Sequence, residues 1–413
     1  MKVKKVFANL FLVFTLVFSL LTPNSVSASG INLSINGKSK ALSSDIVNKS
    51  GLTYAPFREI FEALGAYVYW DATNQQAVAK TNGRTVKVRA SDSYAEVTIG
   101  KTTSNIKISP PFIQNGQTYV PIRDAAEALG FEVDWISSTQ TIDINVVPTV
   151  FVHGFSGNEN TFKESINILS NEFSQLTHKV IVKSNGDVSL NKIVSENIKV
   201  ASPLVSVVFE SNNASLDEQG AWINDAAAEI SKEFNTTNMN FVTHSMGGLA
   251  LTRHIVDTNG KYVKKLVTLG SPIDGAGGAN FLSFIREQLN ISVNQVVTND
   301  ALDDLARGSS AIKYNHDRKG SFPKNIGVLS YAGRTAINTV DYNDHDGYVS
   351  VQSAFYLSNY TDNINCVRAW GADHSYLHDS PYVLDTVKKF LIGADIWVTQ
   401  PNVNSCDLMF DED

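Results

Sequence analysis

The sequence predicts an α/β protein with a mostly parallel sheet, preceded by a smaller α+β domain built from a duplicated repeat. Two observations lead to this prediction. In residues 148–395, apolar strand-like runs alternate with helical stretches, which is the pattern of a parallel sheet covered by helices. In residues 31–147, one segment occurs twice at a constant offset, which indicates duplication of a structural unit. At 413 residues the chain has room for both domains.

The first residues have the pattern of an export signal. Lys2, Lys4 and Lys5 precede an apolar run from Val6 to Leu21, and the small residues of Val26–Ala28 offer a cleavage site. We therefore expect a signal peptide over residues 1–28 and a secreted or cell-surface bacterial protein. A retained signal anchor is the alternative.

Charge and cysteine content exclude several classes of function. The formal net charge is −7, and removal of the three lysines of the leader takes it to −10. Such an acidic protein is not expected to bind nucleic acid. The two cysteines, Cys366 and Cys406, exclude a thiolate metal site; they either form one disulfide bond, tying the tail of residues 396–413 to the last strand, or remain free thiols.

The repeat has a proline, a short helix and a tryptophan strand in each copy. Gly51–Gly65 is echoed by Gly116–Gly130. The offset is 65 residues for each of three matched pairs: Pro56 and Pro121, Gly65 and Gly130, and Trp70 and Trp135. Each copy predicts a strand, a helix that begins at the proline and ends at Leu-Gly, and a second strand that carries the tryptophan.

The repeat resembles the copper amine oxidase N-terminal-like domain of exported proteins, over nearly all of residues 31–147. The resemblance implies a stalk or attachment module. Copper binding is not expected, because residues 31–147 contain no histidine. A structural role is the favoured interpretation, and association with the cell wall through exposed aromatic side chains is the alternative.

From Pro148 onward the alternation of strands and helices defines the second domain. We expect strands at Thr149–Val152, Val180–Lys183, Leu204–Phe209, Met239–Val242, Lys264–Thr268, Gly327–Tyr331 and Asn363–Trp370, and helices at Asn160–Ser170, Glu218–Phe234, Gly248–Asp257 and Val383–Leu391. The segment Gly275–Pro323 falls outside the alternation and is either a cap over a site, with helical character around Asn280–Val297, or a surface excursion.

Thr243-His244-Ser245-Met246-Gly247 predicts a nucleophile elbow. It follows an apolar strand and opens a helix, so a sharp turn would lift the Ser245 hydroxyl clear of the sheet. Thr243 stands where this motif usually has glycine, and an ordinary Ser-Gly turn is the alternative. His244 is expected to point away from Ser245 and to serve local packing.

A second turn, His153-Gly154-Phe155, follows the first strand of this domain. Its backbone would approach a ligand closely, so the Phe155 amide is predicted to form half of an oxyanion hole. The Met246 amide, just after Ser245, would form the other half.

A serine nucleophile needs a histidine base and an orienting acid at later strand ends. His374 follows the last strand and precedes the final helix, so it is the predicted base, with His378 and His345 as rivals. Asp346 begins an Asp-Gly turn and is the predicted acid. The alternative for the carboxylates of residues 341–346 is a solvated turn or a calcium-binding loop.

With these motifs, residues 148–392 resemble an α/β hydrolase, most closely the lipase-like subgroup of unknown function called DUF915. The matching pieces include Val150–Phe155, Thr243–Gly248, Leu269–Pro272, Asp346–Val349 and Asp373–Leu377. The resemblance implies the α/β-hydrolase fold and carries the family's nucleophile, acid and base onto Ser245, Asp346 and His374. Tyr348 departs from the family pattern, where a small aliphatic residue is commoner.

The expected function is that of an exported serine hydrolase that cleaves carboxylic esters of small molecules or lipids, as a carboxylesterase or lipase. The triad mechanism needs neither a metal nor an organic cofactor. Two alternatives stay open: a surface-binding protein whose hydrolase domain is inactive, and an acyltransferase. The acyl and alcohol preference and the oligomeric state do not follow from the sequence.

Overall fold

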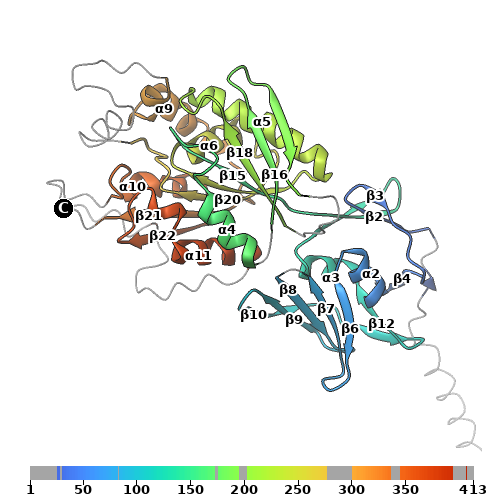
Figure 1. Ribbon diagram of the computed structural model, residues 1–413. Helices are drawn as coiled ribbons and strands as arrows, with labels where there is room; N and C mark the ends of the chain where they lie inside the picture. Colours follow the sequence, from blue (N-terminus) through green and yellow to red (C-terminus); the bar gives the residue numbers. More distant parts are fainter. Residues whose placement is uncertain are drawn as a thin grey trace, which may run out of the picture.

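A computed structural model shows two domains joined near residue 147 (Figure 1). It describes residues 26–27, 30–81, 83–172, 175–194, 202–276, 300–335, 345–393 and 406. The signal peptide prediction falls largely on residues 1–25, outside this set; within the predicted leader, β1 (Val26–Ser27) pairs antiparallel with β4 (Val47–Lys49). Among the described residues, no helix is long and apolar enough to span a membrane.

The two repeat copies fold alike, as the sequence predicts. The first copy contains β5 (Leu52–Pro56), α2 (Phe57–Ala63) and β6 (Tyr67–Asp71), and the second contains β12 (Gln117–Pro121), α3 (Ile122–Ala128) and β13 (Glu132–Ile136). Pro56 and Pro121 are the N-cap residues of the two helices. Gly65 and Gly130 follow them with φ of 89° and 93°, a conformation that favours glycine.

A local two-fold axis relates the two copies. β5 and β12 pair antiparallel, and Ala55 lies opposite Val120. These two positions are 65 residues apart, so each residue pairs with its own repeat equivalent at this point. The two copies of the repeat are therefore joined to each other by the pairing of β5 with β12.

The remaining strands of this domain complete two further sheets. One sheet has the order β10-β9-β8-β7-β6, and the other the order β13-β14-β2-β3. The added strands are β2 (Asn32–Ile35), β3 (Lys38–Ser39), β7 (Gln76–Thr81), β8 (Arg84–Val88), β9 (Tyr94–Ile99), β10 (Thr102–Lys107) and β14 (Thr141–Asn145). β11 (Phe112–Gln114) extends the β5–β12 sheet.

The second domain is built on one sheet in the order β17-β16-β18-β15-β19-β20-β21-β22. Its strands are β15 (Thr149–Val152), β16 (Gln175–Val182), β17 (Val188–Lys192), β18 (Pro203–Phe209), β19 (Met239–His244), β20 (Val263–Leu269), β21 (Gly327–Arg334) and β22 (Ile364–Trp370). All neighbours are parallel except β16 and β17. The prediction of a mostly parallel sheet is confirmed. β17 is an additional strand: its alternating apolar residues, Val188 and Leu190, pack against the core, but the run is too short to stand out from a loop in the sequence.

Helices cover both faces of this sheet (Figure 1). α4 (Lys163–Glu172) and α11 (Pro381–Ile392) pack on one face, and α5 (Leu216–Phe234) and α6 (Met246–Thr258) on the other. Successive strand residues contribute to opposite faces: Phe241 joins the α5–α6 core and Val242 the α4–α11 core. This period of two sends every second side chain to the same layer.

The region predicted as a cap contains two short helices, α8 (Asp300–Leu305) and α9 (Ser310–Asp317). Its expected helical part, Asn280–Val297, lies outside the described residues. α10 (Val351–Ala354) follows the Asp346 turn. Cys366 on β22 forms a disulfide bond with Cys406, so of the two alternatives for the cysteines the bridge is the one observed.

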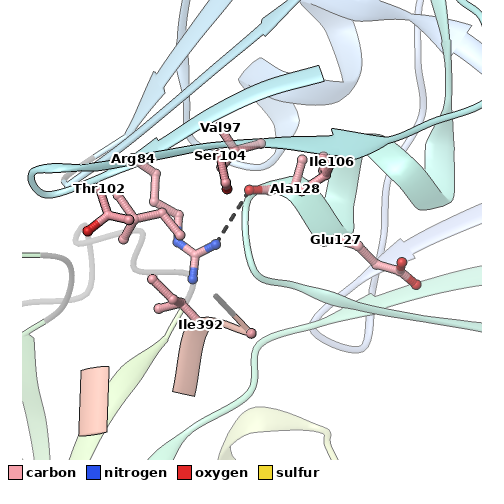
Figure 2. A pocket seen from close by; sticks show the side chains of 10 residues that line it. Arg84, Val97, Thr102, Ser104, Ile106, Glu127, Ala128 and Ile392 are labelled. Atoms are coloured by element: carbon pink, nitrogen blue, oxygen red, sulfur yellow. Dashed lines mark hydrogen bonds between the residues drawn. The ribbon is translucent and has the colours of Figure 1, made fainter. Parts of the chain in front are cut away.

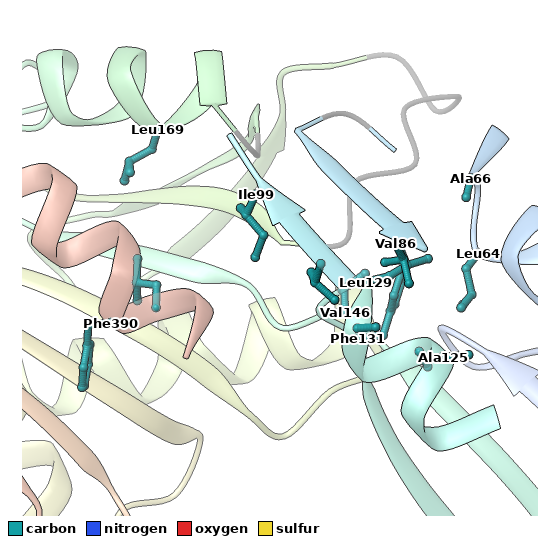
Figure 3. Close-up of a cluster of buried hydrophobic side chains, with 14 of the residues drawn as sticks. Leu64, Ala66, Val86, Ile99, Ala125, Leu129, Phe131, Val146, Leu169 and Phe390 are labelled. Carbon is teal, nitrogen blue, oxygen red and sulfur yellow. The ribbon is translucent and has the colours of Figure 1, made fainter. Parts of the chain in front are cut away.

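One apolar core runs across the domain boundary (Figure 3). It joins Leu129 and Phe131 of the second repeat copy, Ile99 of β9, and Leu169 of α4 and Phe390 of α11. Glu132 adds polar contacts, since its carboxylate accepts hydrogen bonds from Asn238 at 2.8 Å and Lys264 at 3.3 Å. The repeat domain is thus packed against the sheet domain and is not connected to it by a linker alone.

Candidate active site

Ser245 occupies the turn between β19 and α6. Its φ of 52° and ψ of −127° are strained for a residue with a side chain. The Ser245 amide donates to Leu269 O at 3.0 Å, and its carbonyl accepts from Gly248 N at 3.1 Å. These bonds hold the turn in the geometry that exposes a hydroxyl at the carboxyl end of the sheet.

Two glycines after Ser245 allow the backbones to approach. A Cβ atom on Gly247 would lie 2.5 Å from His153 O and 2.6 Å from Val152 O. A Cβ atom on Gly248 would collide with Ser271 Oγ and lie 2.9 Å from Thr243 Oγ1. Any other residue would force helix α6 away from the sheet.

Thr243, which replaces the usual glycine of the motif, has a structural role through its hydroxyl group. It is fully buried, and its Oγ1 donates to Val267 O on β20 at 2.8 Å. Because Gly248 supplies the free space beside it, a side chain is tolerated at position 243. The threonine ties the elbow strand to the next strand.

The turn after β15 lies directly against the elbow. A Cβ atom on Gly154 would be 2.8 Å from Ser245 Cβ and 3.1 Å from the Met246 nitrogen. The buried His153 anchors this turn: its Nε2 accepts from Phe209 N at 3.1 Å, so its Nδ1 carries the proton and donates to Gly154 O at 2.9 Å. Burial lowers the pKa of His153, which favours this neutral form.

Asp346 and His374, 28 residues apart, form a buried hydrogen-bonded pair. His374 Nδ1 lies 2.7 Å from Asp346 Oδ2, and the His374 amide donates to Asp346 O at 2.9 Å. The other carboxylate oxygen, Oδ1, accepts from the amides of Tyr348 and Val349 at 3.0 and 2.8 Å. The Asp-Gly turn thus holds the carboxylate by two backbone donors and aims it at the imidazole.

The rival histidines have other partners. His345 Nδ1 accepts from the Gly347 amide at 2.9 Å, and His378 Nδ1 lies 2.9 Å from Asp379 Oδ1. His374 is therefore the histidine that the structure pairs with Asp346. Tyr348 lies edge-on to the His374 ring at 5.4 Å between centroids, which gives this unusual residue a contact with the imidazole.

His244 does more than fill space beside the elbow. Its Nε2 lies 2.9 Å from His374 O, and its ring centroid is 4.6 Å from that of His374 and 4.7 Å from that of His378. Burial, and then the neighbouring His374 and His378, hold the pKa of His244 well below its usual range, so the neutral ring donates to the carbonyl. Sequence reasoning missed this contact, because nothing local shows that the end of β19 meets the loop of His374, 130 residues later in the chain.

Ser245 and His374 line one cavity of about 160 Å³, together with the predicted oxyanion residue Phe155. Pro272, Ala276 and Leu305 add apolar walls. Of the carboxylates weighed for calcium, Asp341 and Asp344 lie outside the described residues; among the residues that are described, no cluster of three or more histidine, cysteine or acidic side chains is placed to hold a metal.

The chain is similar to two known families. Residues 137–394, more than half of the chain, match the model of the alpha/beta hydrolases of unknown function, DUF915. Residues 34–144 match the copper amine oxidase N-terminal domain. The second domain is thus an α/β hydrolase, and the chain belongs to the DUF915 family.

Solved structures are similar at low identity. A gene product of Listeria innocua is 22% identical, with 60% of this chain and 94% of that one covered and a TM-score of 0.47. The mature form of a Bacillus licheniformis lipase is 17% identical, with 60% and 92% covered and a TM-score of 0.42. No curated protein matches the chain.

Proposed function

We propose that this α/β hydrolase is an exported serine hydrolase that cleaves carboxylic esters. The observation that carries the proposal is the convergence of a strained Ser245 and an Asp346-bonded His374 on one cavity. This is the constellation that converts a poor nucleophile, a serine hydroxyl, into a reactive one.

In the first step His374 takes the proton of Ser245 as the oxygen attacks the ester carbonyl. The Nδ1 contact with Asp346 at 2.7 Å leaves Nε2 as the basic atom and stabilises the imidazolium that forms. The alcohol leaves with the proton that His374 returns, and an acyl group stays on Ser245.

The amides of Phe155 and Met246 are proposed to hold the oxyanion. Gly154 supports this assignment, because its close approach to Ser245 and to the Met246 nitrogen brings the two turns together. Donors fixed beforehand stabilise developing charge without reorganisation, and loss of one costs roughly 10²- to 10³-fold in turnover. Water then attacks the acyl group by the same proton path.

The test is hydrolysis of p-nitrophenyl esters by the mature protein and by Ser245→Ala. We expect the variant to lose at least about 10³-fold in kcat. Ser184→Ala, an exposed serine of the same domain, is the matched control and should keep full activity. Equal rates for Ser245→Ala and wild type would exclude Ser245 as the nucleophile.

Two further assays divide the substrate classes. A series of acyl chains from acetyl to palmitoyl separates a carboxylesterase from a lipase. Product analysis with an added alcohol tests acyl transfer, since a transferase would yield a new ester in place of the free acid.

We also propose that the repeat domain associates with the cell wall after export. Tyr67, Trp70 and Trp135 support this, because they are exposed to 70%, 47% and 46% on the repeat strands β6 and β13. Exposed aromatic side chains of this kind are candidates for contact with a polymer. Fractionation of cells that express the full chain, or a chain without residues 31–147, measures the association; equal retention at the surface would contradict it.

A further inference from the structure

A second cavity lies at the junction of the two domains, far in sequence from the elbow. It has a volume of about 70 Å³ and is lined by Arg84 of β8, Thr102 and Ser104 of β10, and Ile392 and Gly393 at the end of α11 (Figure 2). A single water needs roughly 10–15 Å³ of such space, so a group of several atoms fits. Both domains contribute to its walls.

Arg84 is a buried cation in this cavity. The residue is 7% exposed, and one hydrogen bond is observed for its guanidinium, from Nη1 to Ala128 O at 3.4 Å. A guanidinium has five N–H donors, so most of its donor capacity is unused by the described part of the chain. Burial lowers the pKa of Arg84 to about 10, the direction expected of a cation taken out of water.

No carboxylate of the described residues compensates this charge. Glu127 lines the cavity, but its carboxylate pairs with Arg123 at 3.3 Å, and Figure 2 shows it turned away from the Arg84 guanidinium. Gly130 makes the burial possible, because a Cβ atom there would lie 2.7 Å from Arg84 Nη2. A buried charge without a partner is costly, so the arrangement favours an anion.

Helix α11 does not provide that anion. Its C-terminal carbonyls face the junction, but Lys265 Nζ donates to Phe390 O at 2.7 Å and to Leu391 O at 3.0 Å. The end of α11 is thus neutralised by a lysine of β20, since a cation near a helix C-terminus is favourable. Burial, and then the charges of Lys264 and Arg84, lower the pKa of Lys265 to about 8, so a second, partly buried cation adds to the positive potential.

We propose that the cavity around Arg84 binds a small oxyanion of the phosphate or sulfate class and thereby clamps the repeat domain to the end of α11. The guanidinium fork matches two oxygens of such an ion, and the Thr102 and Ser104 side chains stand at the same cavity wall. The site is independent of ester hydrolysis, and its test uses stability and binding of the full mature chain.

The experiment measures Tm and calorimetric binding with millimolar inorganic phosphate against chloride at equal ionic strength. Low concentrations are needed because phosphate stabilises proteins generally at high concentration. We expect wild type to bind one phosphate and to gain about 2 °C or more in Tm. Arg84→Met should lose both responses.

Two further variants distinguish loss of phosphate binding from a folding defect of Arg84→Met. Ser104→Leu fills the cavity from an exposed strand position and should abolish the response while Arg84 stays in place. Arg89→Met removes an arginine whose side chain is 52% exposed, and it should respond like wild type.

Two results would overturn the proposal: no phosphate response in wild type, and an undiminished response in both Arg84→Met and Ser104→Leu. If wild type gives no response but Asp395→Asn does, the carboxylate of Asp395, two residues beyond Gly393 in the sequence, takes the place of a free anion.

Discussion

In the repeat domain the same polar contacts occur twice, whereas in the hydrolase domain each contact around the elbow occurs once. Arg58 Nη1 donates to Glu62 at 3.1 Å and to Val68 O at 3.0 Å. Arg123, its equivalent, donates to Glu127 at 3.3 Å and to Val133 O at 2.5 Å. Because these contacts occur in both copies, they stabilise the fold of the repeat unit.

The hydrolase contacts have no such copies. The Asp346–His374 pair, the Thr243 hydroxyl and the His244–His374 contact all lie around the carboxyl ends of β19 to β22. Contacts that recur in both copies therefore stabilise the repeat unit, whereas buried polar contacts that occur once, gathered at the carboxyl ends of the strands, belong to the candidate site.

The largest effect is expected for Asp346→Asn. The amide keeps the size of the side chain but cannot hold the imidazole in the required tautomer, so kcat for p-nitrophenyl esters should fall by about 10⁴-fold. Steady-state kinetics with a folding check by circular dichroism measures this. A loss below tenfold in a folded variant would remove Asp346 from the proposed triad.

The junction between the two halves should show a pH-dependent stability. Lys265 has a folded-state pKa of about 8 against the ordinary lysine pKa of 10.5, so between these values the unfolded chain binds more protons than the folded one. The free energy of unfolding should therefore rise from pH 8 to pH 10, by up to about 3 kcal/mol. Urea denaturation across this range measures it, and Lys265→Met should flatten the curve; an equal slope in the variant would assign the effect elsewhere.

Thr243→Val tests whether the departure at the elbow is structural. Loss of the hydroxyl that bonds Val267 O should lower the free energy of unfolding by about 1–2 kcal/mol, while kcat stays within about threefold. A large loss of kcat without loss of stability would instead place Thr243 in the chemistry.

His244 should act as a positioning residue for His374. His244→Phe keeps a ring but loses the donor to His374 O, and kcat should fall by about tenfold, the scale of one hydrogen bond. His244→Gln keeps a nitrogen donor and should recover part of the loss. A higher activity of His244→Phe than of His244→Gln would show that the ring, and not the hydrogen bond, matters.

The smallest effects are expected where the contact is repeated. Arg58 and Arg123 have side chains more than half exposed, at 58% and 54%. Replacement of either by methionine should cost below about 1 kcal/mol, and the two costs should be equal and additive. Clearly unequal losses of unfolding free energy would show that the two copies are not energetically equivalent.

Local patterns predicted much of this molecule. The order of strands and helices from β15 to α11 follows hydrophobic periodicity. Each predicted strand overlaps an observed strand, and their ends differ by at most about five residues. β17 was missed because its apolar residues, Val188 and Leu190, form too short an alternating run; it forms as the antiparallel partner of β16. Pairing of Asp346 with His374 was expected from chain order, but its geometry came from the Tyr348 and Val349 amides.

The duplicated domain, the α/β alternation and the candidate residues Ser245, Asp346 and His374 could be predicted from the sequence, because repeats, periodicity and short motifs are properties of neighbouring residues. The support of the His374 loop by His244, the bond between Cys366 and Cys406, and the burial of Arg84 between the domains became visible in the three-dimensional structure. These are contacts between distant segments, and their energies depend on packing and burial that no local pattern records.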